Sequence, residues 1–192
     1  MLAKETNLLD IMRTVAKKVA AIRSDQRGVS AIEFSFFVGL LAFGLLNIVD
    51  ISRYIYQRME LENATQMAVQ AVWKTCDPNT SPYPLPATTK CTQMLTAVTD
   101  AVHSTSLGTN VSLQAGSPAE GYYCVNGSNK LVKVSDVSSK PADCSAAGMP
   151  SLQPADYIEI AAQFAYAPIF PGITVAGAFA TPITKTAMMR LN

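Results

Sequence analysis

The stretch Arg27-Gly28-Val29-Ser30-Ala31-Ile32-Glu33-Phe34, with the apolar run behind it, decides the fold of this chain. The run from Ala31 to Val49 contains 19 residues, and Glu33 is the only charged one among them. At a rise of 1.5 Å per residue, a helix of this length measures about 28 Å, close to the roughly 30 Å of a bilayer's hydrocarbon core. We therefore interpret the run as a single membrane span.

Two alternatives to a span can be weighed from the sequence. A buried helix of a soluble domain normally keeps a polar face, whereas large apolar residues lie on every face of this run. A secretory signal peptide needs a small-x-small cleavage site after its apolar core, and the following Asp50-Ile51-Ser52-Arg53-Tyr54-Ile55 offers none. The run is also longer than the usual apolar core of such a signal.

Glu33 is the unusual residue of the run. A carboxylate at the centre of a bilayer costs roughly 2.5–3.5 kcal/mol, so such a residue usually has a partner or a function. Alternatively, Glu33 lies at the headgroup edge, where water and the positive N-terminus of the helix satisfy it. The position of Glu33 so close to polar Ser30 leaves both interpretations open.

A glycine, four further residues, the pair Glu33-Phe34 and an apolar run follow one another here, with basic residues before the glycine. This order resembles the cleavage site of type IV prepilins and pseudopilins. The resemblance implies that a prepilin peptidase cuts between Gly28 and Val29 on the cytoplasmic side and leaves the span on the mature protein. The cut would create a positive amine on Val29. Residues four apart share a helix face, so Glu33 would neutralise this amine in its own chain or in a neighbour's during assembly.

Two further segments make the resemblance to a family more specific. They are Ile48-Val49-Asp50-Ile51-Ser52-Arg53-Tyr54 and Leu61-Glu62-Asn63-Ala64. With them the chain resembles the TadE-like family, which are pseudopilins, or minor pilins, of the tight-adherence (Tad/Flp) type IV pilus system. The likeness covers about residues 27–72, with a looser one in the last thirty residues. The family often has a proline about where Gly39 stands, so a kink of that type is not expected here.

The resemblance also implies partners. These are the prepilin peptidase, an inner-membrane pilus assembly platform, a second related pseudopilin and the major pilin, besides the membrane lipid. It implies a structural role in pilus assembly and no enzymatic activity. The net charge of +1 gives no reason to expect a nucleic acid partner.

The distribution of charge predicts the topology. Six basic and three acidic residues precede Val29, whereas nine basic and eleven acidic residues follow from there on. A basic N-terminal flank favours the cytoplasm for that side of a span. We therefore expect a single-pass protein of the bacterial inner membrane, with its N-terminus in the cytoplasm and its C-terminal part in the periplasm. The resemblance also implies that the protein is incorporated in the pilus.

The four cysteines, Cys76, Cys91, Cys124 and Cys144, all lie beyond the span. An even number of cysteines in an oxidising compartment predicts two disulfides. Three pairings are possible and the sequence does not decide among them; we favour nearest neighbours, Cys76 with Cys91 and Cys124 with Cys144. No two cysteines have the C-x₂₋₄-C spacing of a zinc site, and the only histidine is distant.

The chain divides into four predicted segments. These are a cytoplasmic basic prepilin leader (1–28), a transmembrane segment (29–50), an extracytoplasmic continuation of the helix (51–75) and a periplasmic globular head (76–192). Proline is absent before Pro78, and glycine is absent between Leu45 and Cys76, so nothing interrupts the long helix. We predict an α+β protein, with a long pilin-like N-terminal transmembrane and amphipathic helix followed by a small, disulfide-stapled head whose sheet is mainly antiparallel.

The leader has apolar residues at three-and-four spacing and basic residues on its other faces. This pattern fits a basic amphipathic helix on the inner membrane surface, and an unstructured basic tail that only sets topology fits equally well. The apolar positions are Leu8, Met12, Val15, Val19 and Ile22.

Beyond Asp50 the long helix becomes amphipathic. We expect Tyr54 and Ile55 on its apolar stripe, and Tyr54 and Tyr56 near the outer membrane interface, as in an aromatic belt. In the head, turn signals and alternating patterns predict a Pro-rich loop, one short helix, five strands and a hairpin turn at Asn126-Gly127-Ser128-Asn129. The loop covers 77–89, the helix 91–104, and the strands 109–114, 122–125, 130–134, 157–166 and 182–191.

No motif in the chain carries chemistry. Asp100, His103 and Ser104 lie close in sequence, but a catalytic triad needs groups converging from a rigid scaffold with an oxyanion site. We therefore expect no catalytic, cofactor-binding or metal-binding residues. Two rivals to the tight-adherence assignment are a type II secretion pseudopilin, which the residues after the span disfavour, and a membrane-anchored periplasmic binding or enzymatic domain in which Glu33 is incidental.

Overall fold

The computed structural model describes residues 12–18, 27–76 and 86–191. Its main element is one helix, α2, which begins at Arg27 and ends at Thr75. The sequence predicts a helix to about residue 73, and the structure confirms it to within two residues. The chain separates into two compact units, residues 1–48 and residues 49–192. Residues 12–18 are helical, and Leu8, Val19 and Ile22 of the predicted leader helix lie outside the described residues.

The part of α2 in the first unit is apolar on every face. Every residue from Gly28 to Phe43 is exposed, and the exposed fractions of Phe34 and Phe36 are 70% and 69%. The helix is long and apolar enough to cross a membrane by length and composition. Such a surface is unfavourable in water and is compatible with membrane anchoring.

The part of α2 in the second unit has one buried face. Buried residues recur there at every third or fourth position, the spacing of a single helix face. Leu61, Ala68 and Val72 on this face are fully buried. This face packs against the sheet and forms the hydrophobic core of the head.

The head contains a five-stranded antiparallel sheet, so the α+β prediction is confirmed. The strands are β1 (Val111–Leu113), β2 (Ala119–Val125), β3 (Leu131–Asp136), β4 (Ala155–Phe164) and β5 (Ile183–Arg190). The order is β1-β4-β2-β3, and β5 pairs with β4 along its other edge. The long strand β4 is therefore central: β1 and β2 pair with different parts of it on one side, and β5 pairs with residues 157–164 on the other.

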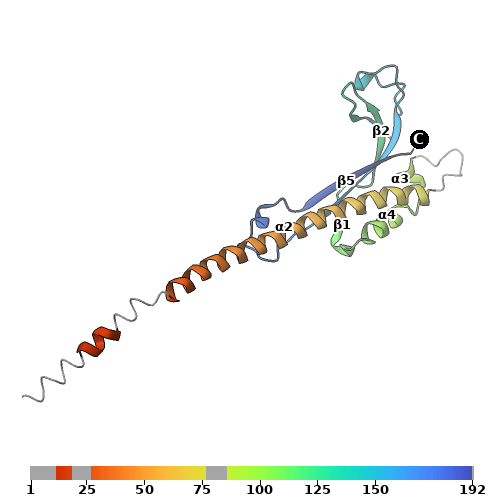
Figure 1. Ribbon diagram of the computed structural model, residues 1–192. Helices are drawn as coiled ribbons and strands as arrows, with labels where there is room; N and C mark the ends of the chain where they lie inside the picture. Colours follow the sequence, from red (N-terminus) through yellow and green to blue (C-terminus); the bar gives the residue numbers. More distant parts are fainter. Residues whose placement is uncertain (1–11, 19–26, 77–85, 192) are drawn as a thin grey trace, which may run out of the picture. The chain divides into compact units, whose positions relative to one another are not determined.

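Strand β4 alternates strictly between buried and half-buried side chains. Successive side chains of a strand point to opposite faces, so its even-numbered residues form one buried face. Ile158, Ile160 and Ala162 on this face are fully buried and belong to the core that includes Leu61 of α2. Figure 1 shows β5 running alongside the same part of α2, and an ion pair of 2.6 Å between Lys185 Nζ and Glu62 Oε2 joins the two.

Two short helices and two disulfides complete the head. Helix α3 is Ala87–Lys90 and helix α4 is Met94–His103. The disulfide Cys76–Cys91 links the end of α2 to the residue after α3, and Cys124–Cys144 links β2 to the loop before β4. Both disulfides were expected, and their pairing is the nearest-neighbour one that the sequence favoured.

Several details differ from the sequence predictions. Ile55 was placed on the buried stripe but is 51% exposed. Tyr54 is half-buried, and its ring packs against Tyr166 and Phe179 at centroid distances of 5.0 and 4.6 Å, contacts that the sequence did not predict; its place near the membrane interface stays a prediction. Residues 87–89 of the predicted loop belong to α3, and the part of that loop from 77 to 85, with Pro78, Pro82 and Pro84, lies outside the described residues.

Candidate functional site

The predicted cleavage bond between Gly28 and Val29 lies in the first turn of α2. Val29 is 57% exposed and Glu33 is exposed one turn further on. Residues four apart lie on one face of a helix, so Val29 and Glu33 are neighbours on the surface of α2. Within the described residues, no side chain pairs with the Glu33 carboxylate.

Three glycines of α2 have no role inside the described part of the chain. A Cβ atom built on Gly28, Gly39 or Gly44 would meet no atom within 4 Å. Glycine inside a helix costs about 1 kcal/mol relative to alanine. Packing among the described residues therefore gives no reason for these glycines.

Asp50 follows the apolar run directly and is fully buried in the head. Its carboxylate accepts hydrogen bonds from the backbone N–H of Ile169 at 2.9 Å and of Phe170 at 3.2 Å, and from the Thr174 hydroxyl at 2.6 Å. The Tyr166 hydroxyl donates to the Asp50 carbonyl oxygen at 3.1 Å. Buried carboxylates are stable only when hydrogen-bonded in this way, so Asp50 holds the segment between β4 and β5 on α2.

A second buried carboxylate, Glu120 of β2, holds helix α3. It accepts hydrogen bonds from the backbone N–H of Ala87 and of Thr88, both at 2.8 Å, and from the Thr88 hydroxyl at 2.7 Å. The first N–H groups of a helix lack partners within the helix, and Glu120 satisfies them from a distant strand. The end of α2 is thus tied to the sheet through α3 and the Cys76–Cys91 disulfide.

Asp156 of β4 is the exception among the buried carboxyl groups. It is 2% exposed, and neither of its carboxyl oxygens has a hydrogen-bond partner in the described part of the chain. Burial, followed by the negative charge of Glu120, raises the pKa of Asp156 to about 7, although the positive charge of Lys140 lowers it. Asp156 is therefore a carboxyl group that the fold keeps protonated well above its ordinary range.

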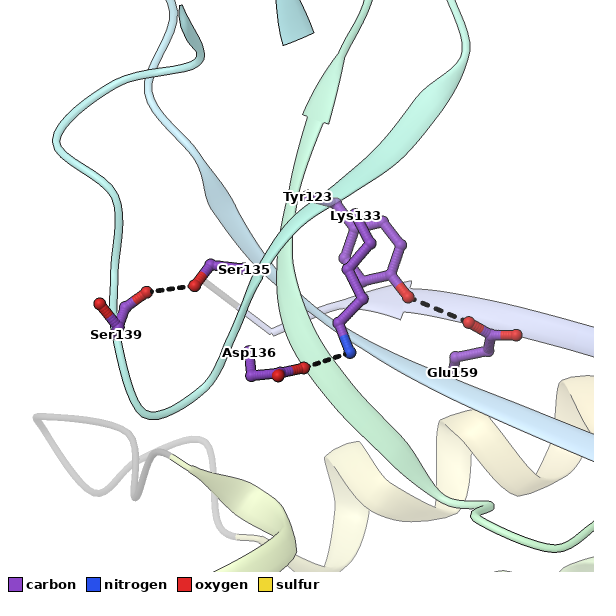
Figure 2. A network of polar contacts seen from close by, with 6 residues as sticks. All are labelled: Tyr123, Lys133, Ser135, Asp136, Ser139 and Glu159. Atoms are coloured by element: carbon purple, nitrogen blue, oxygen red, sulfur yellow. Dashed lines mark hydrogen bonds and ion pairs between the residues drawn. The ribbon is translucent and has the colours of Figure 1, made fainter. Parts of the chain in front are cut away.

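Two further polar contacts, which Figure 2 shows, lie on the strands: one joins β2 to β4 and the other lies within β3. The Tyr123 hydroxyl donates to Glu159 Oε2 at 3.0 Å, and Lys133 pairs with Asp136 at 2.5 Å. Burial and the hydrogen bond to Glu159 raise the pKa of Tyr123 to about 12. Lys133 and Asp136 are exposed, so their ion pair contributes little to stability.

Sequence reasoning assigned Asp50 to the end of the membrane segment and gave no role to Glu120 or Asp156. The sequence contains a feature that singles out Asp50, because Asp50 is the first charged residue after the 19-residue run. The sequence also contains a feature that singles out Asp156, because Asp156 occupies one of the alternate positions of its strand that are otherwise apolar and buried. No feature of the sequence points to Glu120, because its hydrogen-bond partners lie more than 30 residues earlier and only the fold brings them close.

The fold and the site define a class of protein: one N-terminal apolar helix, compatible with single-pass membrane anchoring, that continues into a disulfide-bonded α+β head. Within this class, residues 28–70 match the model of the family described as TadE-like protein. This segment of the chain is therefore TadE-like, as its resemblance had indicated. No curated protein and no solved structure matches the chain significantly.

The match contains Gly28, Val29, Glu33 and Asp50 and ends within α2. The TadE-like family is associated with the tight-adherence pilus and is structural rather than enzymatic. The looser likeness of the last thirty residues lies outside the match and stays a prediction. Among the described residues, no group of three His, Cys, Asp or Glu side chains lies close enough together to hold a metal ion.

Proposed function

We propose that this protein is a pseudopilin, or minor pilin, of a tight-adherence pilus, which a prepilin peptidase cuts between Gly28 and Val29. The observation that carries the proposal is the 16-residue stretch from Gly28 to Phe43, exposed throughout and carrying Glu33 as its only charge. After cleavage the apolar helix would begin at Val29. It would then pack among the equivalent helices of the major pilin and of a second related pseudopilin on the inner-membrane assembly platform.

Glu33 is the assembly carboxylate in this proposal. The new amine of Val29 and the Glu33 carboxylate share one face of α2, either within a chain or between neighbours. In a bundle of apolar helices an unpaired charge is costly, so their pairing favours one axial stagger of the subunits over others. Phe34 belongs to the apolar surface that such a bundle buries.

The glycines support the same proposal. Among the described residues, no atom lies where a side chain at Gly28 would be, but a peptidase pocket that accepts only a hydrogen at this position requires glycine there. A Cβ on Gly39 or Gly44 would likewise meet no described atom within 4 Å, and small residues let apolar helices approach closely. The basic leader and the two disulfides support a cytoplasmic N-terminus and a periplasmic head in the bacterial inner membrane.

The experiment that tests processing compares two identical substitutions in one helix. Gly28→Leu should leave the full-length precursor in a host with an active prepilin peptidase, whereas Gly39→Leu should still be cut. Mass spectrometry of the membrane-extracted protein gives the mature N-terminus. A mature N-terminus elsewhere, or an unprocessed Gly39→Leu protein, contradicts the proposal.

The assembly role is tested with Glu33→Ala. Removing the carboxylate makes the span more favourable in lipid, so this variant should be inserted, cut and stable. It should nevertheless fail to support piliation, which is measured as a surface-pilus count beside an immunoblot for the mature form. Normal piliation would mean that Glu33 is merely tolerated at the edge of the membrane.

A further inference from the structure

The segment between β4 and β5, residues 165–182, contains no charged residue. We call it the β4–β5 loop. Ile169 and Ile173 of this loop are 48% and 54% exposed, and Val175 is 55% exposed. Three exposed branched apolar side chains within seven residues of an uncharged segment indicate an interaction surface rather than an ordinary solvent-exposed loop.

The position of this loop is fixed by α2. The backbone N–H groups of Ile169 and Phe170 and the Thr174 hydroxyl all donate to the Asp50 carboxylate. Arg53, one turn further along α2, donates to the Ala167 carbonyl oxygen at 3.4 Å. The loop is therefore attached to the helix at the residue where the 19-residue apolar run has just ended.

The hydrogen bonds to Asp50 also lower the cost of moving the loop backbone into a medium with little water. Irregular backbone is costly in lipid because its N–H groups lose their water partners. Here Asp50 already satisfies two of these N–H groups, and the Asp50 carboxylate is itself saturated by three donors. Ile169 and Ile173 can therefore enter an apolar medium without leaving these groups unpaired.

We propose that the β4–β5 loop inserts Ile169 and Ile173 into the lipid interface on the head side of the membrane. The inference rests on the proposed membrane span, since it places the end of the apolar run at that interface. The polar interfacial layer is about 5–8 Å deep on each side of the hydrocarbon core. A residue hydrogen-bonded to Asp50 lies within that layer when the run ends at the hydrocarbon boundary. The occupant is lipid, because the loop is apolar and uncharged and is hydrogen-bonded to Asp50, the residue that directly follows the span.

The test places single tryptophans in the full-length protein, with Trp73, its only native tryptophan, replaced by phenylalanine. The protein is reconstituted in vesicles of phosphatidylethanolamine and phosphatidylglycerol whose acyl chains carry bromine near the headgroup end. The probes are Ile169→Trp and Ile173→Trp. The controls are Leu45→Trp in the span, 53% exposed, and Leu131→Trp on the β2–β3 hairpin, 41% exposed.

Bromine should quench the fluorescence of Ile169→Trp and Ile173→Trp and of Leu45→Trp, and it should leave that of Leu131→Trp unchanged. Quenching of Leu45→Trp without quenching of either loop probe overturns the inference and leaves the span intact. If the emission of a loop tryptophan shifts to shorter wavelength without being quenched, the tryptophan contacts protein instead of lipid, and this result also overturns the inference. If Leu45→Trp itself is not quenched, the proposed span fails and the inference fails with it.

Discussion

Asp156→Asn is the substitution whose effect follows most directly from the structure. Asp156 is almost fully buried, lacks a hydrogen-bond donor in the described part of the chain and lies near Glu120. Its pKa is raised to about 7 from an ordinary value of 3.8. Between these two pH values the folded chain holds a proton that the unfolded chain releases. The stability of the head is therefore greatest at the acid end of this window, falls as the pH rises to about 7 and is level above that.

The size of this effect follows from linkage. Each unit of pH within the window changes the free energy of unfolding by about 1.4 kcal/mol, so raising the pH from 5 to 8 should cost the wild type roughly 2.5 kcal/mol. Asparagine does not titrate, so the contribution disappears in Asp156→Asn. Whatever its stability at pH 5, the variant should gain on the wild type by about 2.5 kcal/mol between pH 5 and pH 8, because only the wild type loses stability over this range.

The assay is urea unfolding of the full-length protein in mild detergent with the disulfides intact, repeated from pH 5 to pH 8. Trp73, near the end of α2 and 44% exposed, reports the unfolding by fluorescence. Asp100→Asn makes the same chemical change at an exposed position of α4 and should leave the pH dependence of the wild type unchanged. Parallel curves for the wild type and Asp156→Asn would refute the reasoning.

Three further outcomes are expected from the head, each measured by the same unfolding assay. Replacing Cys76 and Cys91 with serine opens a loop with a sequence separation of 15 and should cost about 3 kcal/mol, whereas replacing Cys124 and Cys144, separated by 20, should cost slightly more; equal stability with and without reductant in the wild type would contradict this. Gly121→Ala should cost about 1–3 kcal/mol, because its Cβ would lie 2.6 Å from Lys133 Cε and 2.9 Å from the Ser135 carbonyl oxygen, and Gly127→Ala, with no atom within 4 Å, is the control. Tyr123→Phe should cost about 1 kcal/mol at neutral pH; in an alkaline absorbance titration it should remove the phenol with a pKa of about 12, whose contribution to stability fades as the pH rises above about 10.

The elements of this chain were predictable where one signal dominates. Helix α2 follows from an apolar run joined to an amphipathic one, without glycine from Leu45 to Cys76 or proline before Pro78. Strand β4 was recognisable because residues 157–166 alternate in part, and a strand buried on one face has a period of two. The β2–β3 hairpin was recognisable from Asn126-Gly127, although the residue with positive φ is Asn129, at 57°.

The contacts that assemble these elements were not predictable, because they join residues far apart in sequence. Asp50 bonds to residues about 120 positions later, and nothing near Asp50 in the sequence points to Ile169 or Thr174. Tyr54 illustrates the same limit. Its ring packs against Tyr166 and Phe179, which lie more than 100 residues later, and nothing near Tyr54 in the sequence points to either of them.

The fold explains some glycines of the chain but not others. Gly121 has an internal cause, because the backbone of β3 lies where its side chain would be. For Gly28, Gly39 and Gly44 the described residues show no such cause, and glycine in the interior of α2, as at Gly39 and Gly44, makes the helix less stable by roughly 1 kcal/mol relative to alanine. The same stretch of α2 contains Glu33, for which the described residues provide no partner. Costs that nothing within a chain offsets are expected where a surface is shaped for contacts outside it, and here they gather on the segment proposed for cleavage and assembly.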